Sequence, residues 1–228
     1  MYKYETHLHT FPVSKCAVSP VRESLEYYKQ HNYDGVFITN HFLDGNIGID
    51  KELPYEEKLD FFFSDYKEAL EIGKELGIKV FLGYELSYKG TDFLVYGLDA
   101  DWFYAHPEIM DMKKSEELPY LQEAGALVVQ AHPYLKARYL DHIRLYPQYV
   151  QGAEVLNSSR PEAENTIAQF FAQHYDLIPF AGSDFHGTGR TKPLSGMASQ
   201  TPITSEKEFV EMALAGQLEI FLEEQENV

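Results

Sequence analysis

The chain has 228 residues, 44% of them hydrophobic, which suits one well-buried domain of the size that α/β barrels reach. Its 36 acidic and 19 basic side chains give a formal net charge of -17, and such a surface repels polyanions, so we expect no general nucleic-acid binding through a basic face. A small phosphorylated substrate stays compatible with this charge, because bound cations can invert the field inside a pocket.

The sequence shows no internal repeat, linker or low-complexity tract, so we predict a single domain over residues 1–228. Its one cysteine, Cys16, excludes an intrachain disulfide framework. The N-terminus has no charged-then-apolar signal segment, and no apolar run reaches membrane-spanning length. These observations predict a cytoplasmic protein without membrane contact, and they leave the oligomeric state open.

Short β-rich apolar runs alternate along the chain with longer amphipathic stretches. The runs typical of strands span residues 2–10, 35–42, 79–88, 92–98, 126–133, 152–157 and 177–186. Helical periodicity covers residues 19–31, 57–77, 161–175 and 205–216. Strands that alternate with helices favour a parallel sheet with crossover helices. The remaining stretches 43–56 and 187–201 have the composition of loops.

Local signals mark where two of these helices begin and end. Ser19 is the expected N-cap of the first helix, with Pro20 at its first helical position. In the last helix, Ser205 and Glu208 have the spacing of a capping box, and Gly216 is the expected C-terminal stop.

Two histidines stand two positions apart in the first predicted strand. Successive side chains of a strand point to opposite faces, so His7 and His9 project from the same face. In parallel α/β folds the carboxyl ends of the strands converge on one mouth, where active sites sit. Most of the other predicted strands end in an imidazole or a carboxylate, supplied by His41, Glu85, His132, Asp184 and His186. We therefore expect these seven side chains to gather in space.

Five histidines and two carboxylates are too many for one Ser-His-Asp arrangement. Imidazole nitrogen and carboxylate oxygen suit zinc, manganese and iron, and a carboxylate can bridge two such ions. Paired metal ions activate water and stabilise both the attacking and the leaving oxygen of a displacement at phosphorus. The residues thus predict a site for two or more divalent ions.

Five short motifs follow one another between about residues 4 and 186, namely "HLHT", "ITNH", "GYE", "AHP" and "GSDFH". In this order they resemble the successive motifs of the PHP (polymerase and histidinol phosphatase) family. The resemblance implies an α/β fold, a distorted (β/α)7 barrel similar to a TIM barrel. It also implies a centre of three metal ions, drawn from Zn, Mn or Fe, that usually hydrolyses a phosphoester.

The resemblance further implies which side chains hold each ion. One ion would be surrounded by His7, His9, Glu85 and Asp184. Glu85 would bridge to a second ion held by His132, and His41 with His186 would hold the third. Glu85 and Asp184 are then the catalytic candidates, because they would bridge metals or orient water.

Two positions depart from the pattern of many family members. Many carry a further ligand after the first motif, where this chain has Lys15 and Cys16. A thiolate at Cys16 could bind a soft metal, but we favour a small apolar cysteine packed under the loop. Many also carry a histidine in the strand after the bridging glutamate, where Asp92 is the nearest substitute here. Asp92 could serve as a ligand or equally cap the strand start, so two metals are predicted more securely than three.

For phosphate recognition the natural residue is arginine, whose planar fork binds two oxygens. Three arginines follow predicted strand ends on loops that should face the mouth, although each could equally form a solvated salt bridge: Arg138, Arg160 and Arg190. Asn157 ends the sixth predicted strand, where it could orient a substrate or ligand or cap the following helix.

We predict from these features a metal-dependent phosphoesterase that acts on a small phosphomonoester or a nucleotide, with water activated at the metals as the nucleophile. One alternative is a related barrel that hydrolyses amides or lactones, which would place a lysine between two metals at a strand end. None of the predicted strands ends in lysine. The other alternative is a metal-binding regulatory module without turnover, which the two departures keep open.

Overall fold

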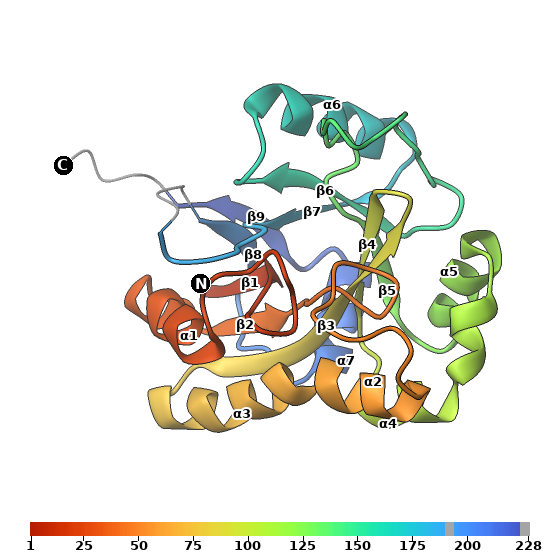
Figure 1. Cartoon of the computed structure of the whole chain (residues 1–228). Coiled ribbons are helices and arrows are strands. Elements are labelled where there is room, and N and C mark those ends of the chain that lie inside the picture. The colour runs from red at the N-terminus through yellow and green to blue at the C-terminus, as the bar shows by residue number, and fades with distance from the viewer. Residues whose placement is uncertain (190–193, 224–228) are drawn as a thin grey trace.

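The computed structural model describes residues 1–189 and 194–223 as one curved sheet surrounded by helices (Figure 1). Across the sheet the strands follow the order β7-β6-β5-β4-β3-β2-β1-β8-β9. Their bounds are β1 (Tyr2–Leu8), β2 (Gly35–Ile38), β3 (Lys79–Tyr88), β4 (Thr91–Tyr96), β5 (Leu127–Gln130), β6 (Gly152–Asn157), β7 (Ile178–Gly182), β8 (Ser195–Ser199) and β9 (Glu219–Leu222).

The sheet curls until β7 reaches β1, so it is a nearly closed barrel. Leu8, the last residue of β1, forms a parallel bridge with Phe185, which follows the end of β7. The backbone N–H of His9 donates to the carbonyl of Phe185 at 2.9 Å, and the N–H of Phe185 donates to the carbonyl of His7 at 3.1 Å. The predicted distorted α/β barrel is confirmed.

Helices cover the outside of the barrel. In Figure 1, α1 lies at the left, α2 and α3 lie below the sheet, α5 lies at the right and α6 lies above. The helices are α1 (Val21–Gln30), α2 (Tyr55–Phe62), α3 (Ser64–Leu76), α4 (Ala100–Ala105), the 3-10 helix η1 (Pro107–Asp111), α5 (Lys114–Glu123), α6 (Glu162–His174) and α7 (Glu206–Leu214).

The end of the barrel where the parallel strands begin is filled by aromatic rings. Phe209 of α7 lies 4.4 Å from Phe37 of β2 and 5.2 Å from Tyr96 of β4, between ring centroids. Phe180 of β7 completes this group, and all four rings are fully buried. Because this end is closed by apolar packing, polar chemistry is left to the opposite end.

Not all strands are parallel, which corrects the expected topology. β4 pairs antiparallel with both β3 and β5. Lys89 and Gly90 connect β3 to β4 with φ values of 51° and 77°, as a tight two-residue hairpin requires. The connection is too short for a crossover helix, and such a connection must return antiparallel.

Residues 187–201 were expected to form a loop, but Ser195–Ser199 form β8. This strand pairs antiparallel with β1, and β9 extends the sheet beyond it. Ser195 also bonds across to the end of β7, where its Oγ donates to the carbonyl of Gly182 at 2.7 Å. β8 therefore helps to close the barrel between its first and last parallel strands.

The predicted helix boundaries and caps are confirmed in part. The helix expected over 57–77 is divided at Phe63 into α2 and α3. Pro20 occupies the N-cap position of α1, and Ser19 Oγ donates to Glu23 instead of capping the helix. In α7 the Ser205 hydroxyl accepts the N–H of Glu208, so this half of the capping box is confirmed.

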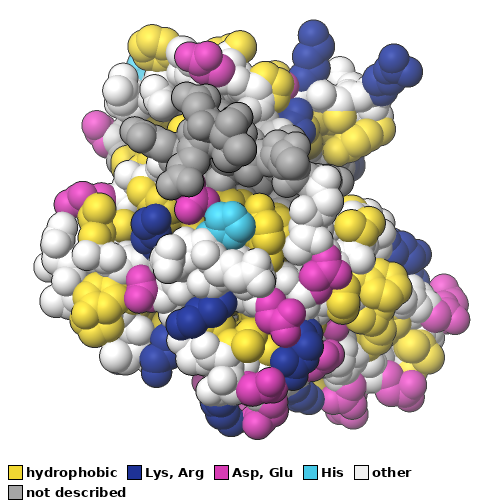
Figure 2. All heavy atoms as spheres, turned by 90° about the vertical axis from the view of Figure 1, so that its left-hand side faces the viewer, with side chains coloured by type: hydrophobic (Ala, Val, Ile, Leu, Met, Phe, Trp, Pro, Cys, Tyr) yellow, Lys and Arg dark blue, Asp and Glu magenta, His cyan; other side chains and the backbone are white. Residues whose placement is uncertain are grey.

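Charged and apolar side chains are mixed on the face shown in Figure 2, where Lys and Arg side chains are scattered among acidic ones. Each helix in the described ranges 1–189 and 194–223 is too short or too polar to cross a membrane.

Candidate metal centre

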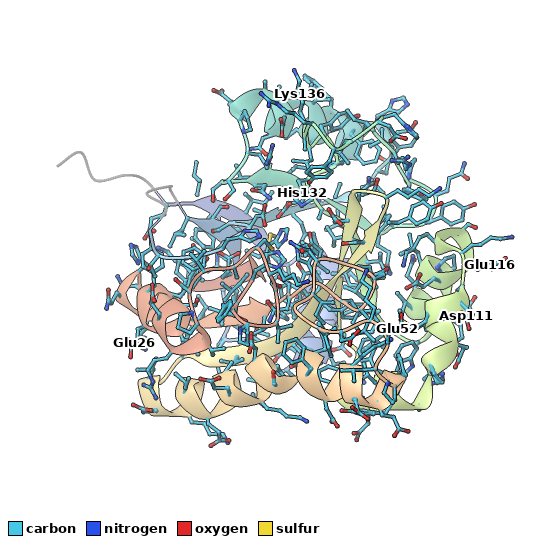
Figure 3. All side chains as sticks on the ribbon, in the orientation of Figure 1. Glu26, Glu52, Asp111, Glu116, His132 and Lys136 are labelled. Atoms are coloured by element: carbon cyan, nitrogen blue, oxygen red, sulfur yellow. The ribbon has the colours of Figure 1, made fainter. Side chains whose placement is uncertain are left out.

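All seven predicted metal ligands lie together at the carboxyl end of the parallel strands. Their side-chain nitrogen and oxygen atoms, with one sulfur, form three groups whose members lie within 4.8 Å of one another. These groups are His7 with Glu85 and His132, His7 with His9 and Asp184, and His9 with Cys16, His41 and His186. Figure 3 places His132 in the interior, whereas the labelled Glu26, Asp111 and Glu116 lie on outer helices or loops.

The parallel strands deliver these side chains from well-separated parts of the sequence. His7 lies in β1 and His9 directly follows it, while His41 follows β2 and forms a bridge to Glu85. Glu85 lies within β3, because the β3–β4 hairpin extends this strand beyond the barrel edge. After β5 and β7 come, respectively, His132 and the pair Asp184 and His186.

The distances between ligand atoms fit shared metal ions. His7 Nε2 lies 3.2 Å from His9 Nε2 and 3.3 Å from Glu85 Oε1. His132 Nε2 lies 3.4 Å from the same Glu85 oxygen, and Asp184 Oδ1 lies 3.5 Å from His9 Nε2. Ligands that surround one ion at about 2.0–2.2 Å lie about 3.0–3.5 Å from each other. The residues therefore fit the divalent ions that the sequence predicts.

Glu85 is a buried carboxylate whose nearest partners are imidazole nitrogens. The residue is 1% exposed, and within the described part of the chain neither carboxylate oxygen accepts a hydrogen bond. An ionised carboxylate without partners is costly to bury. Histidine nitrogens surround it at distances down to 2.7 Å, from His41 Nδ1 to Oε2. A cation among these nitrogens would satisfy both oxygens.

The protonation states of three ligands also suit metal binding. Burial alone would raise the pKa of Glu85, but His41 and His7 hold it well below its usual range. Burial would likewise raise the pKa of Asp184, and His7 and His9 hold it well below its usual range. Burial and the neighbouring His186 and His41 lower the pKa of His9 to about 3, so its imidazole is neutral. Burial lowers the pKa of His7, His41 and His132, but the neighbouring carboxylates raise it above its usual value, so a metal would have to displace a proton from these imidazoles.

Glu154, which the sequence analysis did not select, orients two of the ligands. Its Oε1 accepts a hydrogen bond from His7 Nδ1 at 2.9 Å, which leaves Nε2 of that ring to face the group. Its Oε2 accepts the backbone N–H of His132 at 2.9 Å. Such partners of ligand histidines fix the tautomer and the ring orientation. The available signal was a charged residue inside the apolar run "GAEVLN".

Of the roles expected for Asn157, its bonds favour the orientation of a candidate ligand over capping of α6, whose N-cap is Pro161. Asn157 is fully buried, its Nδ2 donates to Glu154 Oε2 at 3.0 Å, and its Oδ1 accepts the N–H of Ser159. The bond to Glu154 fixes the carboxylate that orients His7, and Asn157 is not among the residues that line the cavity.

A second buried network orients His9. The Ser14 hydroxyl donates to Asn40 Oδ1 at 2.8 Å, so it accepts from His9 Nδ1 at 3.1 Å. Ser14 Oγ also accepts the backbone N–H of His41. Nε2 of His9 is thereby left free to point towards His7.

Two ligands have backbone conformations that side chains rarely adopt. His132 has φ of 23° and Asp184 has φ of 48°, both in the left-handed region. Such strain persists only where the surroundings hold it, and it concentrates at functional sites. Here it turns each side chain inward immediately after a strand ends.

The two departures from the family pattern both lie at the cluster. Asp92 is 9% exposed, and its Oδ2 lies 4.0 Å from His132 Nε2. Cys16 Sγ lies 3.1 Å from His186 Nε2, so the expected apolar packing of this cysteine is wrong. Burial would raise the pKa of the Cys16 thiol, but hydrogen bonds with His186 and His41 lower it to about 6.

A cavity of about 550 Å³ opens above the cluster. Arg160 lines it, and its Nε donates to Glu164 at 2.9 Å. Lys89, which the sequence analysis did not select, lines it from the β3–β4 hairpin. Arg138 is exposed outside the cavity lining, so its predicted position at the mouth is not confirmed, and Arg190 lies outside the described residues.

Comparison with known proteins supports the fold. No family model and no curated protein matches the sequence. Among solved structures, the chain is similar to a protein from Bifidobacterium adolescentis that is provisionally assigned as a metal-dependent phosphoesterase. The TM-score is 0.60 with 15% identity, and the match covers 93% of this chain and 96% of that one. A two-domain protein from Bacteroides vulgatus that contains a predicted PHP-like metal-dependent phosphoesterase gives a TM-score of 0.65 and 13% identity over 97% of this chain, which spans 65% of the length of that protein.

The chain has the fold of PHP-like phosphoesterases. The resemblance seen in the ordered motifs is thus confirmed at the level of the fold. An amidohydrolase from Chromobacterium violaceum, with sulfate and without metal, has the same architecture, with a TM-score of 0.57 and 14% identity over 95% of this chain and 97% of that one. The shared architecture is therefore compatible with hydrolysis of a phosphoester and with hydrolysis of an amide or lactone.

Proposed function

We propose that this protein is a metal-dependent phosphoesterase that acts on a small phosphomonoester or a nucleotide. The observation that carries the proposal is the buried Glu85 carboxylate, whose unbonded oxygens lie among imidazole nitrogens at the mouth of a barrel. The PHP-like fold of the structural neighbours supports it.

The proposed ligands are the seven side chains of the cluster, with Asp92 and Cys16 as further candidates. Two or three divalent ions, from Zn, Mn or Fe, would supply Lewis-acid activation of water and of the phosphate oxygens. Glu85 would lie between two neighbouring ions, and Asp184 would hold its carboxylate towards the cavity that receives the substrate.

The remaining tasks fall to the cavity walls. Arg160 would bind phosphate oxygens that project from the cluster, because it lines the cavity and Glu164 holds its Nε. Lys89 would add positive charge from the opposite hairpin. The cavity lining has these two cations and four carboxylates, Asp44, Glu85, Asp92 and Asp184. This balance of charge fits a small anionic substrate better than a polyanion. We propose no partner beyond this substrate.

Hydrolysis of an amide or lactone remains the second candidate, because a neighbour of the same architecture is an amidohydrolase. That reading expects a lysine between two metals. Lys89 is the lysine that the described part of the cavity lining contains, and it is exposed on a hairpin turn rather than placed among the ligands. The phosphoester is therefore the better-supported bond.

Reconstituted protein decides between these functions. The protein is freed of metal, supplied with Zn²⁺, Mn²⁺ or Fe²⁺, and tested on an aryl phosphomonoester, an aryl phosphodiester, a nucleotide, an aryl amide and a lactone. We expect phosphoester turnover that falls at least about 10³-fold in Asp184→Asn, while the exposed Asp176→Asn keeps the wild-type rate.

Each other outcome has a definite meaning. Turnover of the amide or lactone alone would replace the proposed reaction with the second candidate. Bound metal without turnover of any substrate, together with reduced metal content in Asp184→Asn but not in Asp176→Asn, would favour the non-catalytic module.

A further inference from the structure

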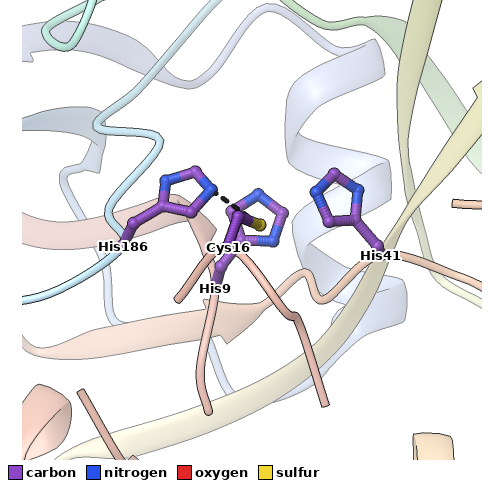
Figure 4. Close-up of side chains that lie close together, drawn as sticks. All are labelled: His9, Cys16, His41 and His186. Atoms are coloured by element: carbon purple, nitrogen blue, oxygen red, sulfur yellow. Dashed lines mark hydrogen bonds between the residues drawn. The ribbon is translucent and has the colours of Figure 1, made fainter. Parts of the chain in front are cut away.

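The third ligand group differs in chemistry from the other two, because it contains sulfur. It combines imidazoles from three strand ends with one thiol, and all its ligand atoms lie within 4.8 Å of one another: His9, Cys16, His41 and His186. Figure 4 shows the Cys16 side chain among the three rings, with its sulfur hydrogen-bonded to His186 Nε2 at 3.1 Å. The other two groups offer nitrogen and oxygen atoms.

The backbone around Cys16 is fixed on both sides. Lys15 N–H donates to the carbonyl of Asn46 at 3.0 Å, and Ala17 N–H donates to the carbonyl of Ser14 at 3.1 Å. Val18 N–H donates to the carbonyl of His186 at 2.7 Å, which ties this loop to the ligand beside the thiol. The thiol therefore points into the group without a rearrangement of the loop.

Cys16 differs from the buried apolar residues near it in sequence, because it lines the cavity. Val13 and Ala17 are buried in the loop at 0% and 3% exposure. Cys16 instead lines the cavity together with His41 and His186. Nearby, both Oε atoms of the almost fully buried Glu85 lack a hydrogen bond within the described residues, and one of them lies 2.7 Å from His41 Nδ1. A cation bound beside His41 would partner that oxygen as well.

We propose that Cys16 is a thiolate ligand of a metal ion that it holds with His41 and His186, next to His9, so that the third site is a nitrogen and sulfur site. Thiolate prefers borderline ions such as Zn²⁺, Co²⁺ and Fe²⁺, whereas Mn²⁺ and Mg²⁺ prefer oxygen ligands. The third site then selects its metal differently from the two sites built on carboxylates. This inference rests on the metal binding of the proposed function and not on its phosphoester chemistry.

Cobalt titration of the full chain tests the proposal without any measurement of activity. Thiolate bound to Co²⁺ gives a near-ultraviolet charge-transfer band, and Cys16 is the one cysteine of the sequence. We expect this band in the wild type, with the intensity of one cobalt–thiolate bond per chain once all the sites are filled. X-ray absorption of the zinc-loaded protein should show sulfur at about 2.3 Å from zinc.

Two variants separate the ligand role from a folding defect. Cys16→Ser should lose the band and one equivalent of zinc, and Cys16→His should regain the equivalent without the band. His106→Ala serves as the matched control, because His106 stacks on Trp102 at 4.4 Å outside the ligand groups. The wild type should bind one equivalent fewer of Mn²⁺ than of Zn²⁺, because the thiolate site should not hold Mn²⁺.

The outcomes distinguish this inference from the proposed function. Wild-type protein that binds cobalt without the thiolate band would overturn the thiolate ligand and leave the metal-dependent phosphoesterase standing. Protein that binds no metal in any of these titrations would overturn both.

Discussion

Buried carboxylates near the histidines differ in how completely their oxygens are bonded. Glu5 accepts the N–H groups of His7 and Ser183 and the hydroxyl of Tyr28, so its oxygens are bonded within the fold, while burial raises its pKa to about 7. Glu154 is likewise bonded at both oxygens. Glu85 is the exception in the described part of the cluster, since neither of its oxygens accepts a hydrogen bond. The contrast separates Glu5 and Glu154, which bond within the fold, from Glu85, whose oxygens face the imidazole nitrogens of the cluster.

Replacement of Glu154 by Gln tests the positioning role. The two oxygens accept from His7 on one side and from His132 and Asn157 on the other, so an amide must turn its NH₂ group towards one set of donors. We expect zinc affinity to fall by about 10- to 100-fold. Zinc affinity is measured by competition with a chromogenic chelator.

Glu206→Gln is the matched control for this variant. Glu206 also accepts a backbone N–H, from Leu82, and the Tyr66 hydroxyl, but it lies outside the ligand groups. It should lose stability without a change in zinc affinity. Equal zinc affinities of Glu154→Gln and the wild type would contradict the role given to Glu154.

At the residue scale, the candidate ligands that could be predicted from the sequence are those whose position follows from strand periodicity. His7 and His9 could be placed on one face because a strand repeats every two residues. Glu154 could not be selected, because it contacts His7 from another strand. Ser14 could not be selected either, because its contact with His9 depends on how the loop after β1 folds back. Asp92 was uncertain for a related reason: the hairpin pairs it with Ser87 at the end of β3, which only the antiparallel direction of β4 explains.

At the level of elements, β1 to β7 were predicted, while β8 and the short β9 were missed. The β8 sequence "SGMAS" has small residues that suit a loop, and it becomes a strand because β1 and β9 offer it partners. The segment 100–123 was also left without helices, although it forms α4, η1 and α5. Pro107 and Pro119 interrupt its helical pattern.

The close approach of β1 and β7 depends on Gly182. A Cβ atom at this position would lie 2.5 Å from His7 Cβ and 2.9 Å from Glu154 Oε1. Gly182→Ala should therefore push His7 out of place and lower the free energy of unfolding by about 1–3 kcal/mol. Gly189→Ala is the control, because its Cβ would meet open space. Urea unfolding measures the effect, and equal midpoints for the two variants would contradict it.

Helix α5 is held to the site by a buried ion pair with an unusual titration. Lys114 Nζ lies 2.6 Å from Glu117 Oε2 and 2.8 Å from Asp44 Oδ2, and Asp44 lines the cavity. Burial raises the pKa of Glu117 to about 7, against the opposing effect of Lys114. A raised pKa in the folded state means that stability from the protonated form is present below about pH 4.5 and is lost as pH rises through 7.

Glu117→Gln should remove this pH dependence, because glutamine resembles the protonated form. At pH 5 the variant and the wild type should have similar free energies of unfolding. At pH 8 the variant should be the more stable, by at most roughly 3 kcal/mol, since one pKa unit corresponds to about 1.4 kcal/mol. Denaturant unfolding in chelator at both pH values measures the difference. A variant that is equally destabilised at pH 5 and pH 8 would show that Glu117 is ionised throughout.

For the whole molecule, the ligand groups connect strands that are far apart in sequence. β1, β2, β3, β5 and β7 each end at or carry a ligand, so ions bound there would link both halves of the barrel. They would also offset negative charge in a chain of net charge -17. An ion that binds the folded chain alone stabilises it, by about 2.7 kcal/mol at a concentration 100-fold above its Kd.

Metal removal should therefore lower the thermal midpoint. For a chain of this size each kcal/mol changes Tm by about 2–4 °C, so a single site filled at that level corresponds to roughly 5–10 °C. Calorimetry of zinc-loaded and chelated protein measures the shift. Added salt should recover little of it, because salt screens exposed charges far more than buried ones. Asp184→Asn should show a smaller shift and Asp176→Asn the full one, whereas identical melting curves with and without zinc would mean that the cluster is stable without a cation.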